Sequence, residues 1–87
     1  MTFYDAYHAI LERGSLTIPM KTNHSDFIEV WASKITKGPR KGEEVLRIKR
    51  AESSLTIDGN DWLEGKSALV RHVRLTIESL LEKERPL

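Results

Sequence analysis

The chain of 87 residues predicts a small two-layer α+β domain with an N-terminal helix, a four-stranded antiparallel sheet and a long C-terminal helix. Three observations lead to this fold class. Apolar residues recur at helical spacing at both ends of the chain, β-branched and aromatic residues crowd its middle, and Gly or Pro separates the segments. A chain of this length forms one domain, which we assign to residues 1–87.

The N-terminal segment predicts a helix over residues 2–13. Thr2 is a suitable N-cap, and Asp5 follows it at the spacing of a capping box. Apolar residues then recur at helical spacing through Ile10, and Gly14 suits the position after the last turn. A helix with one apolar face needs a surface to pack against, and the following segment predicts one.

Residues 15–58 predict four short strands joined by hairpins. Ser-Leu-Thr-Ile occurs at 15–18, where Pro19 closes it, and again at 54–57. Leucine, threonine and isoleucine favour strands, and a closing proline is typical of a sheet edge or a turn. An antiparallel sheet of this kind packs helices on one face and leaves the other face to solvent.

Residues 26–36 fit two interpretations. As a helix, the segment has a capping box formed by Asp26 and Glu29; as a strand, it concentrates β-branched and aromatic residues. Propensity favours the strand, and residues 37–42 then form a hairpin loop before a return strand over 44–50. In that return strand Leu46 and Ile48 face inward, whereas Val45, Arg47 and Lys49 face outward.

The C-terminal segment predicts a helix over residues 61–83. Asp61 and Glu64 have capping-box spacing, and one apolar face continues through Leu81. Gly65 weakens the first turn by about 1 kcal/mol relative to alanine. We expect residues 84–87 to be a frayed tail.

The charge of the chain is unevenly distributed. The 14 Lys and Arg residues nearly balance the 13 Asp and Glu residues, and the net charge of +1 excludes a histone-like polycation. Residues 34–50, however, hold seven basic and two acidic side chains, a net +5, whereas each flank carries −2. The hairpin is therefore a local basic patch that the total charge conceals.

A basic hairpin beside an exposed aromatic ring suits single-stranded nucleic acid, because cations follow the phosphates and the ring stacks on a base. We therefore predict a small non-enzymatic nucleic-acid-binding or regulatory domain. The predicted binding residues are Trp31, Lys34, Lys37, Arg40, Lys41, Arg47, Lys49 and Arg50. If residues 26–36 are helical, the order becomes that of a winged-helix protein, with the hairpin as the wing and Arg40 and Lys41 on phosphates.

Two stretches also carry a family resemblance: Gly-Pro-Arg-Lys-Gly at 38–42, and Ser-Leu-Thr-Ile-Asp-Gly-Asn-Asp-Trp at 54–62. Their order over about residues 16–82 resembles the β-β-β-β-α unit of single-stranded-DNA-binding modules, the PC4 coactivator family and the PUR repeats. The resemblance implies that strand-face residues bind nucleic acid, here Trp31, Lys34, Arg47 and Lys49. It also implies a homodimer through the C-terminal helix, with Leu69, Val73, Ile77 and Leu80 at the interface.

The sequence predicts no catalytic site, cofactor or metal. Cysteine is absent, His8, His24 and His72 lack ligand spacing, and no phosphate-binding glycine motif occurs. The alternative to nucleic-acid binding is a protein-binding accessory factor or inhibitor, for example a phage-encoded one, that acts on a larger protein machine. With no apolar run near about 18 residues and no signal-like N-terminus, we expect a cytoplasmic protein that does not enter a membrane.

Overall fold

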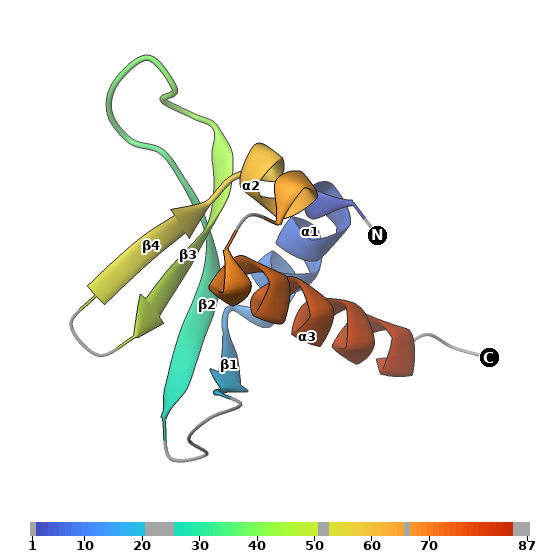
Figure 1. The fold of residues 1–87 in the computed structure, drawn as a ribbon. Helices are drawn as coiled ribbons and strands as arrows, with labels where there is room; N and C mark the ends of the chain where they lie inside the picture. The colour runs from blue at the N-terminus through green and yellow to red at the C-terminus, as the bar shows by residue number, and fades with distance from the viewer. Residues whose placement is uncertain (1, 21–25, 51–52, 66, 85–87) are drawn as a thin grey trace.

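The fold is an α+β domain in which three helices accompany a four-stranded antiparallel sheet (Figure 1). The computed structural model describes residues 2–20, 26–50, 53–65 and 67–84. The elements are α1 (Phe3–Arg13), β1 (Leu16–Pro19), β2 (Phe27–Lys34), β3 (Glu44–Arg50), β4 (Ser53–Ile57), α2 (Gly59–Glu64) and α3 (Ala68–Glu84). The predicted fold class is confirmed.

The sheet is a meander in which each strand pairs with its neighbours in the sequence, in the order β1-β2-β3-β4. Residues 27–34 form β2, so the strand interpretation of this segment is confirmed, and the helical one, with its winged-helix order, is wrong. Ile28 and Val30 are fully buried at the centre of the sheet. Residues two apart in a strand point to the same face, so Ile28 and Val30 both face the core.

The core lies between one face of the sheet and the helices. Val30 is in register with Leu16 of β1 and with Ile48 of β3, and Leu46 is in register with Ile57 of β4. These inward positions meet apolar residues of the helices in one buried cluster. The helical members are Ala6, Tyr7, Ile10, Trp62, Val73 and Ile77. The predicted inward positions of Leu46 and Ile48 are confirmed.

Helix α1 has the predicted cap at each end. The Thr2 hydroxyl accepts a hydrogen bond from the Asp5 backbone N–H, and the Asp5 carboxylate accepts one from the Thr2 backbone N–H, each at 3.2 Å. The latter bond lowers the pKa of Asp5, because it stabilises the charged form. Gly14 follows the helix at φ 91°, a conformation that glycine adopts without strain. An ion pair between Arg13 and Glu84 joins the ends of α1 and α3.

The single helix predicted over residues 61–83 is wrong, because the chain forms two helices that are separated at Gly65. The Asp58 side chain caps α2 and exchanges hydrogen bonds with Asp61, so the capping box lies three residues earlier than predicted. Gly65 ends α2 in the left-handed conformation, with φ 57°. This break lets Trp62, only 2% exposed, enter the core from a direction different from that of α3.

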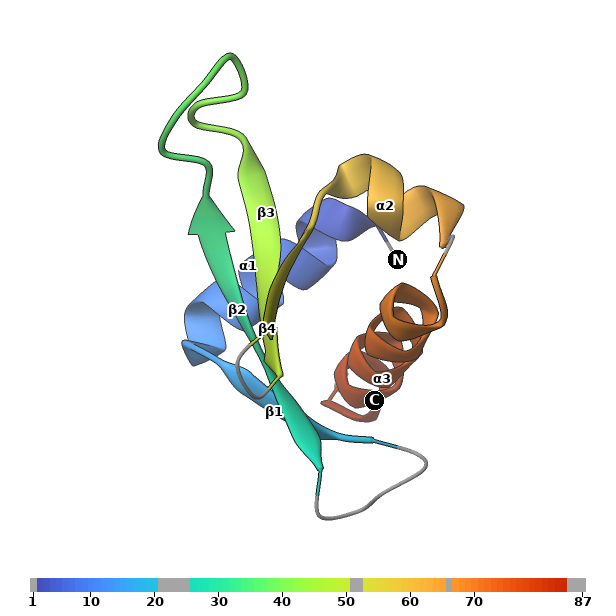
Figure 2. The same ribbon diagram turned by 60° about the vertical axis from the view of Figure 1, so that its left-hand side comes forward.

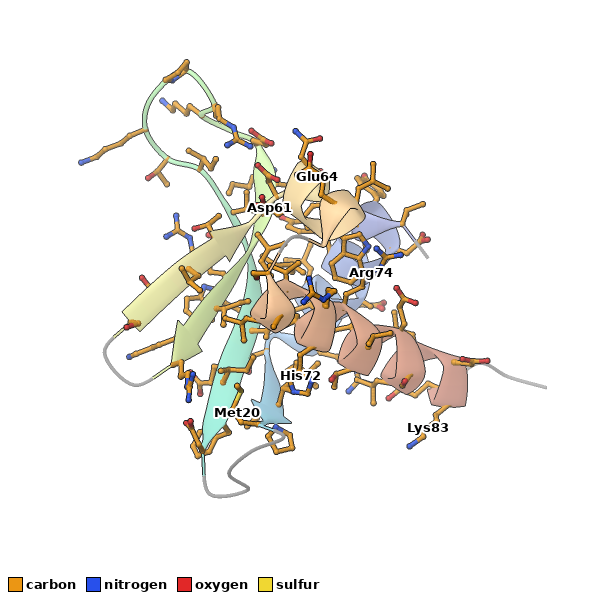
Figure 3. The ribbon with its side chains drawn as sticks, viewed as in Figure 1. Met20, Asp61, Glu64, His72, Arg74 and Lys83 are labelled. Atoms are coloured by element: carbon orange, nitrogen blue, oxygen red, sulfur yellow. The ribbon has the colours of Figure 1, made fainter. Side chains whose placement is uncertain are left out.

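Arg74 fastens the two helices to each other across this break. Its guanidinium lies 5.9 Å from the Trp62 ring centroid, donates to the Trp62 carbonyl at 3.0 Å and donates to Glu78 at 2.8 Å. Figure 3 shows Arg74 on α3, directed toward α2.

The predicted dimer interface is wrong for two of its four residues. Val73 and Ile77 are 0% exposed and belong to the core of their own chain, so they offer no surface to a second copy. Leu69 and Leu80 are half-buried. Of the predicted frayed tail, Glu84 is the last residue of α3, and residues 85–87 lie outside the described residues. None of the described helices combines the length and the apolar composition that a membrane span requires.

We predict that Gly65→Ala lowers the free energy of unfolding by about 1–2 kcal/mol, measured by urea denaturation. A side chain is strained at this φ, and its Cβ would lie 3.3 Å from Cγ of Arg71. The control is Gly59→Ala in the first turn of α2, where the nearest atom is 3.8 Å away. That control keeps or raises the stability, and equal losses in both variants would contradict a left-handed stop at Gly65.

Candidate nucleic-acid interface

The candidate site is the face of the sheet opposite the buried core. Side chains alternate along a strand, so burial of Ile28 and Val30 on one side places Phe27, Glu29 and Trp31 on the other. All three described helices contribute to the buried cluster, and none of them packs on this opposite side (Figures 1 and 2). We call this side the open face.

Trp31 and Arg47 form the centre of the open face. They are directly opposite each other in the register of β2 and β3, and both side chains are partly exposed. Opposite residues in an antiparallel pair have Cβ atoms about 4.5–5.5 Å apart, so the two side chains start from neighbouring positions on this face. Arg47 Nε donates to Ser33 Oγ at 3.2 Å, which directs the guanidinium along β2. Trp31 and Arg47 therefore lie on the same face of the sheet.

Lys49 lies on the same face, opposite Glu29 in the register. Both side chains are exposed, and within the described part of the chain no ion pair joins either of them to another residue. Val45 shares this face but is fully buried, so it packs rather than contacts solvent. Its predicted outward direction therefore does not make it accessible.

The β2–β3 loop extends the site beyond the sheet (Figure 1). Gly42 N donates to Ile35 O at 2.7 Å, and Ile35 N donates to Glu43 O at 3.0 Å, so the base of the loop continues the hairpin. Gly38 and Gly42 both have positive φ, which permits the tight turn. Lys37 and Lys41 are exposed on this loop.

Arg40 behaves differently from the other basic residues of the hairpin. Its guanidinium donates to both carboxylate oxygens of Glu43, at 2.5 and 2.6 Å, and to Asp58 Oδ2 at 2.5 Å. Asp58 is also the cap of α2, so Arg40 ties the loop to that helix. These partners occupy the guanidinium, and the predicted phosphate contact by Arg40 is therefore not supported.

Lys34 and Arg50 also lie apart from the open face. Both alternate with open-face residues and lie on the core side of the sheet, at opposite ends of the β2–β3 hairpin. Arg50 forms an ion pair with Asp26 at 2.5 Å. Of the eight predicted binding residues, the structure therefore brings Trp31, Arg47 and Lys49 together and adds Lys37 and Lys41 on the adjoining loop.

Two residues of the open face were absent from the predicted site. Phe27 is 54% exposed, and Glu29 lies between it and Trp31 along β2. The signal that reveals them is the period of two in a strand, counted back from Trp31. Counting back from Trp31 in steps of two is valid only if residues 26–36 form a strand, and the sequence of this segment also fitted a helix.

A second surface feature is a groove beside α3, with a volume of about 520 Å³. Met20, Leu69 and Leu75 supply apolar lining, and Arg50, Arg71 and His72 supply polar lining. His72 Nε2 lies 3.1 Å from the Pro19 carbonyl oxygen, so α3 contacts the end of β1 at this point. Figure 3 shows His72 on α3 and Met20 just beyond the end of β1.

No protein-family model, curated protein or solved structure matches this chain. The described residues also contain no group of three or more His, Asp or Glu side chains that would hold a metal ion.

The Arg40 cluster affects the titration of its two carboxylates. The Asp61 backbone N–H, and then the Arg40 guanidinium, hold the pKa of Asp58 below its ordinary value. Arg40 likewise lowers the pKa of Glu43. A carboxyl group with a lowered pKa in the folded state stabilises the fold above its ordinary pKa of about 4, and this stabilisation is lost as the pH falls through the lowered value.

We therefore predict that Asp58→Asn and Asp58→Ala have different effects. Asparagine caps a helix as well as aspartate does, so Asp58→Asn retains most of the stability at pH 7, whereas Asp58→Ala loses about 1 kcal/mol. Asp58→Asn also loses less stability than the wild type between pH 5 and pH 3, because the titrating group is gone. Urea denaturation across this pH range tests both points, and an unchanged pH dependence in Asp58→Asn would contradict the assignment.

Proposed function

We propose that the protein binds single-stranded nucleic acid on the open face of its sheet. The observation that carries the proposal is the cross-strand pair of Trp31 and Arg47, with Lys49 beside it, on a face that no described helix covers. A cation attracts a phosphate, and an adjacent aromatic ring stacks on a base. The pair supplies both groups from opposite positions of neighbouring strands.

The partly exposed ring of Trp31 favours a single strand over a duplex. In a duplex the bases are stacked on one another, so the ring has no base to stack on. A single strand can turn its bases onto Trp31 while its phosphates remain near the cations. The loop lysines Lys37 and Lys41 extend the cationic surface past the end of the sheet (Figure 1).

The charge of the face also supports the proposal. Arg40 and Arg50 are neutralised by their ion pairs, whereas Lys37, Lys41, Arg47 and Lys49 have no ion-pair partner among the described residues. Glu29 is the one described carboxylate that the register places on the face beside Lys49 and Arg47. The available cations therefore exceed the carboxylate charge around Trp31, which suits an anionic strand.

Salt-dependent binding tests the proposal. We expect a labelled single-stranded oligonucleotide to bind more tightly than the matching duplex, with an affinity that falls steeply as salt rises. Lys49→Gln is expected to weaken binding several-fold and to reduce the salt slope by about 0.7, because the variant neutralises one phosphate fewer. The measurement is fluorescence anisotropy over a salt series.

The matched control is Lys83→Gln, which removes the same charge from the last turn of α3. It is expected to leave the affinity and the salt slope unchanged. Equal effects of the two substitutions would contradict the assignment of the site to the open face, and absence of binding by the wild type at low salt would refute the proposed function.

A second candidate function is binding of a protein partner, and the groove beside α3 is the observation that favours it. Its apolar lining suits an amphipathic segment, and Arg71 in its lining suits acidic residues in that segment. Leu75 lines the groove and is 58% exposed, so it is accessible to a partner.

Leu75→Asp tests this candidate, with Leu63→Asp on α2 as the control, because Leu63 is 76% exposed and does not line the groove. A partner at the groove disappears from a native-host purification in Leu75→Asp alone. If the partner is a second copy of the chain, sedimentation shows a dimer that only Leu75→Asp dissociates. Equal behaviour of both variants would exclude the groove.

A further inference from the structure

The two strands at the centre of the open face differ in chemistry. Along β2, the open-face residues are Phe27, Glu29 and Trp31; along β3, they include Arg47 and Lys49. Paired strands lie about 4.8 Å apart, and residues two apart in a strand are about 6.6 Å apart. The face therefore carries an aromatic and acidic row beside a cationic row.

The row on β2 attracts bases and repels phosphates. Phe27 and Trp31 are stacking surfaces separated by about 13 Å, the length of four strand residues. The Glu29 carboxylate lies between them, and a phosphate placed there would meet a like charge. The row on β3 attracts phosphates, because Arg47 and Lys49 are cations that form no ion pair with another described residue.

We infer that the open-face residues of β2 contact the bases of the bound single strand and that those of β3 contact its phosphates. We call β2 the base track and β3 the phosphate track. The nucleic acid runs along the β2–β3 hairpin, with bases over Phe27 and Trp31 and phosphates beside Lys49 and Arg47. This inference rests on the proposed function and adds Phe27 and Glu29 to the site. It also places a middle base over Glu29.

Glu29 makes the site selective for the base that binds between the bases on Phe27 and Trp31. Among the described residues its side chain has no hydrogen-bond or ion-pair partner, so the carboxylate is available as an acceptor. The amino group of cytosine donates to a carboxylate, and thymine carries a carbonyl acceptor at the same position of the ring. The site therefore prefers cytosine over thymine at this position.

The first test concerns Phe27. Phe27→Ala is expected to weaken binding of oligo(dC) by about 5- to 150-fold, the range for loss of one stacked base. Phe27→Leu keeps the apolar bulk without the ring and is expected to lose affinity as well. The control is Tyr4→Ala, because Tyr4 is an aromatic residue of nearly equal exposure, 56%, on α1.

Tryptophan fluorescence checks that the strand occupies the same face. Trp31 is partly exposed and is expected to be quenched by a stacked base, whereas Trp62 is buried at 2% exposure and retains its emission. Trp31→Phe is therefore expected to abolish the quenching. Unchanged emission of the wild type on saturation with oligo(dC) would overturn the inference.

The second test concerns Glu29. The wild type is expected to bind oligo(dC) more tightly than oligo(dT), and Glu29→Gln brings the two affinities together, because the glutamine amide both donates and accepts. Glu29→Gln also strengthens binding of oligo(dT), since the like charge is removed. The control is Glu12→Gln, the same change at an exposed position of α1, which leaves both affinities unaltered.

The outcomes separate this inference from the proposed function. Binding that depends on Lys49 but not on Phe27, or a cytosine preference that survives Glu29→Gln, overturns the two-track assignment and leaves single-strand binding intact. A wild-type protein that binds neither oligonucleotide overturns both. Loss of binding in Phe27→Ala but not in Tyr4→Ala, together with the collapse of the cytosine preference, supports the assignment.

Discussion

Burial of one face of the meander under the helices is the constraint on which the rest of the structure depends. Ile28, Val30 and Ile48 lose essentially all their exposed surface there, and each contributes roughly 1.5–3 kcal/mol through burial. Because strand side chains alternate, the same packing directs Trp31 and Arg47 to the opposite side. A slip of one residue would exchange the two sets, so core packing holds the candidate site in register.

The basic hairpin divides into cations that hold the fold together and cations that remain available. Arg40 joins the loop to the cap of α2 through Glu43 and Asp58, and Arg50 pairs with Asp26. The open-face and loop cations have no such partners among the described residues. The Arg40 contacts set the base of the loop, and this in turn places its lysines beyond the end of the sheet.

Elements whose signal is local could be predicted from the sequence. Thr2 and Asp5 cap α1 through bonds between neighbours in the chain, and the segment 27–34, with its β-branched and aromatic residues, forms a strand. The C-terminal region was less predictable, because one apolar face continues across Gly65 and masks the break there. Asp58 and Asp61 have the same spacing as Asp61 and Glu64, and only the three-dimensional structure distinguishes the two capping boxes.

The sequence by itself determined the α+β class and the hairpin with its excess of positive charge. Each follows from residues that are close in the chain. The tertiary structure alone decided which cations are neutralised and which apolar residues of α3 are buried, since Arg40 meets Asp58 and Val73 joins the core cluster only after folding. Partners that are distant in the sequence leave no local pattern, and they determine which charges remain on the open face.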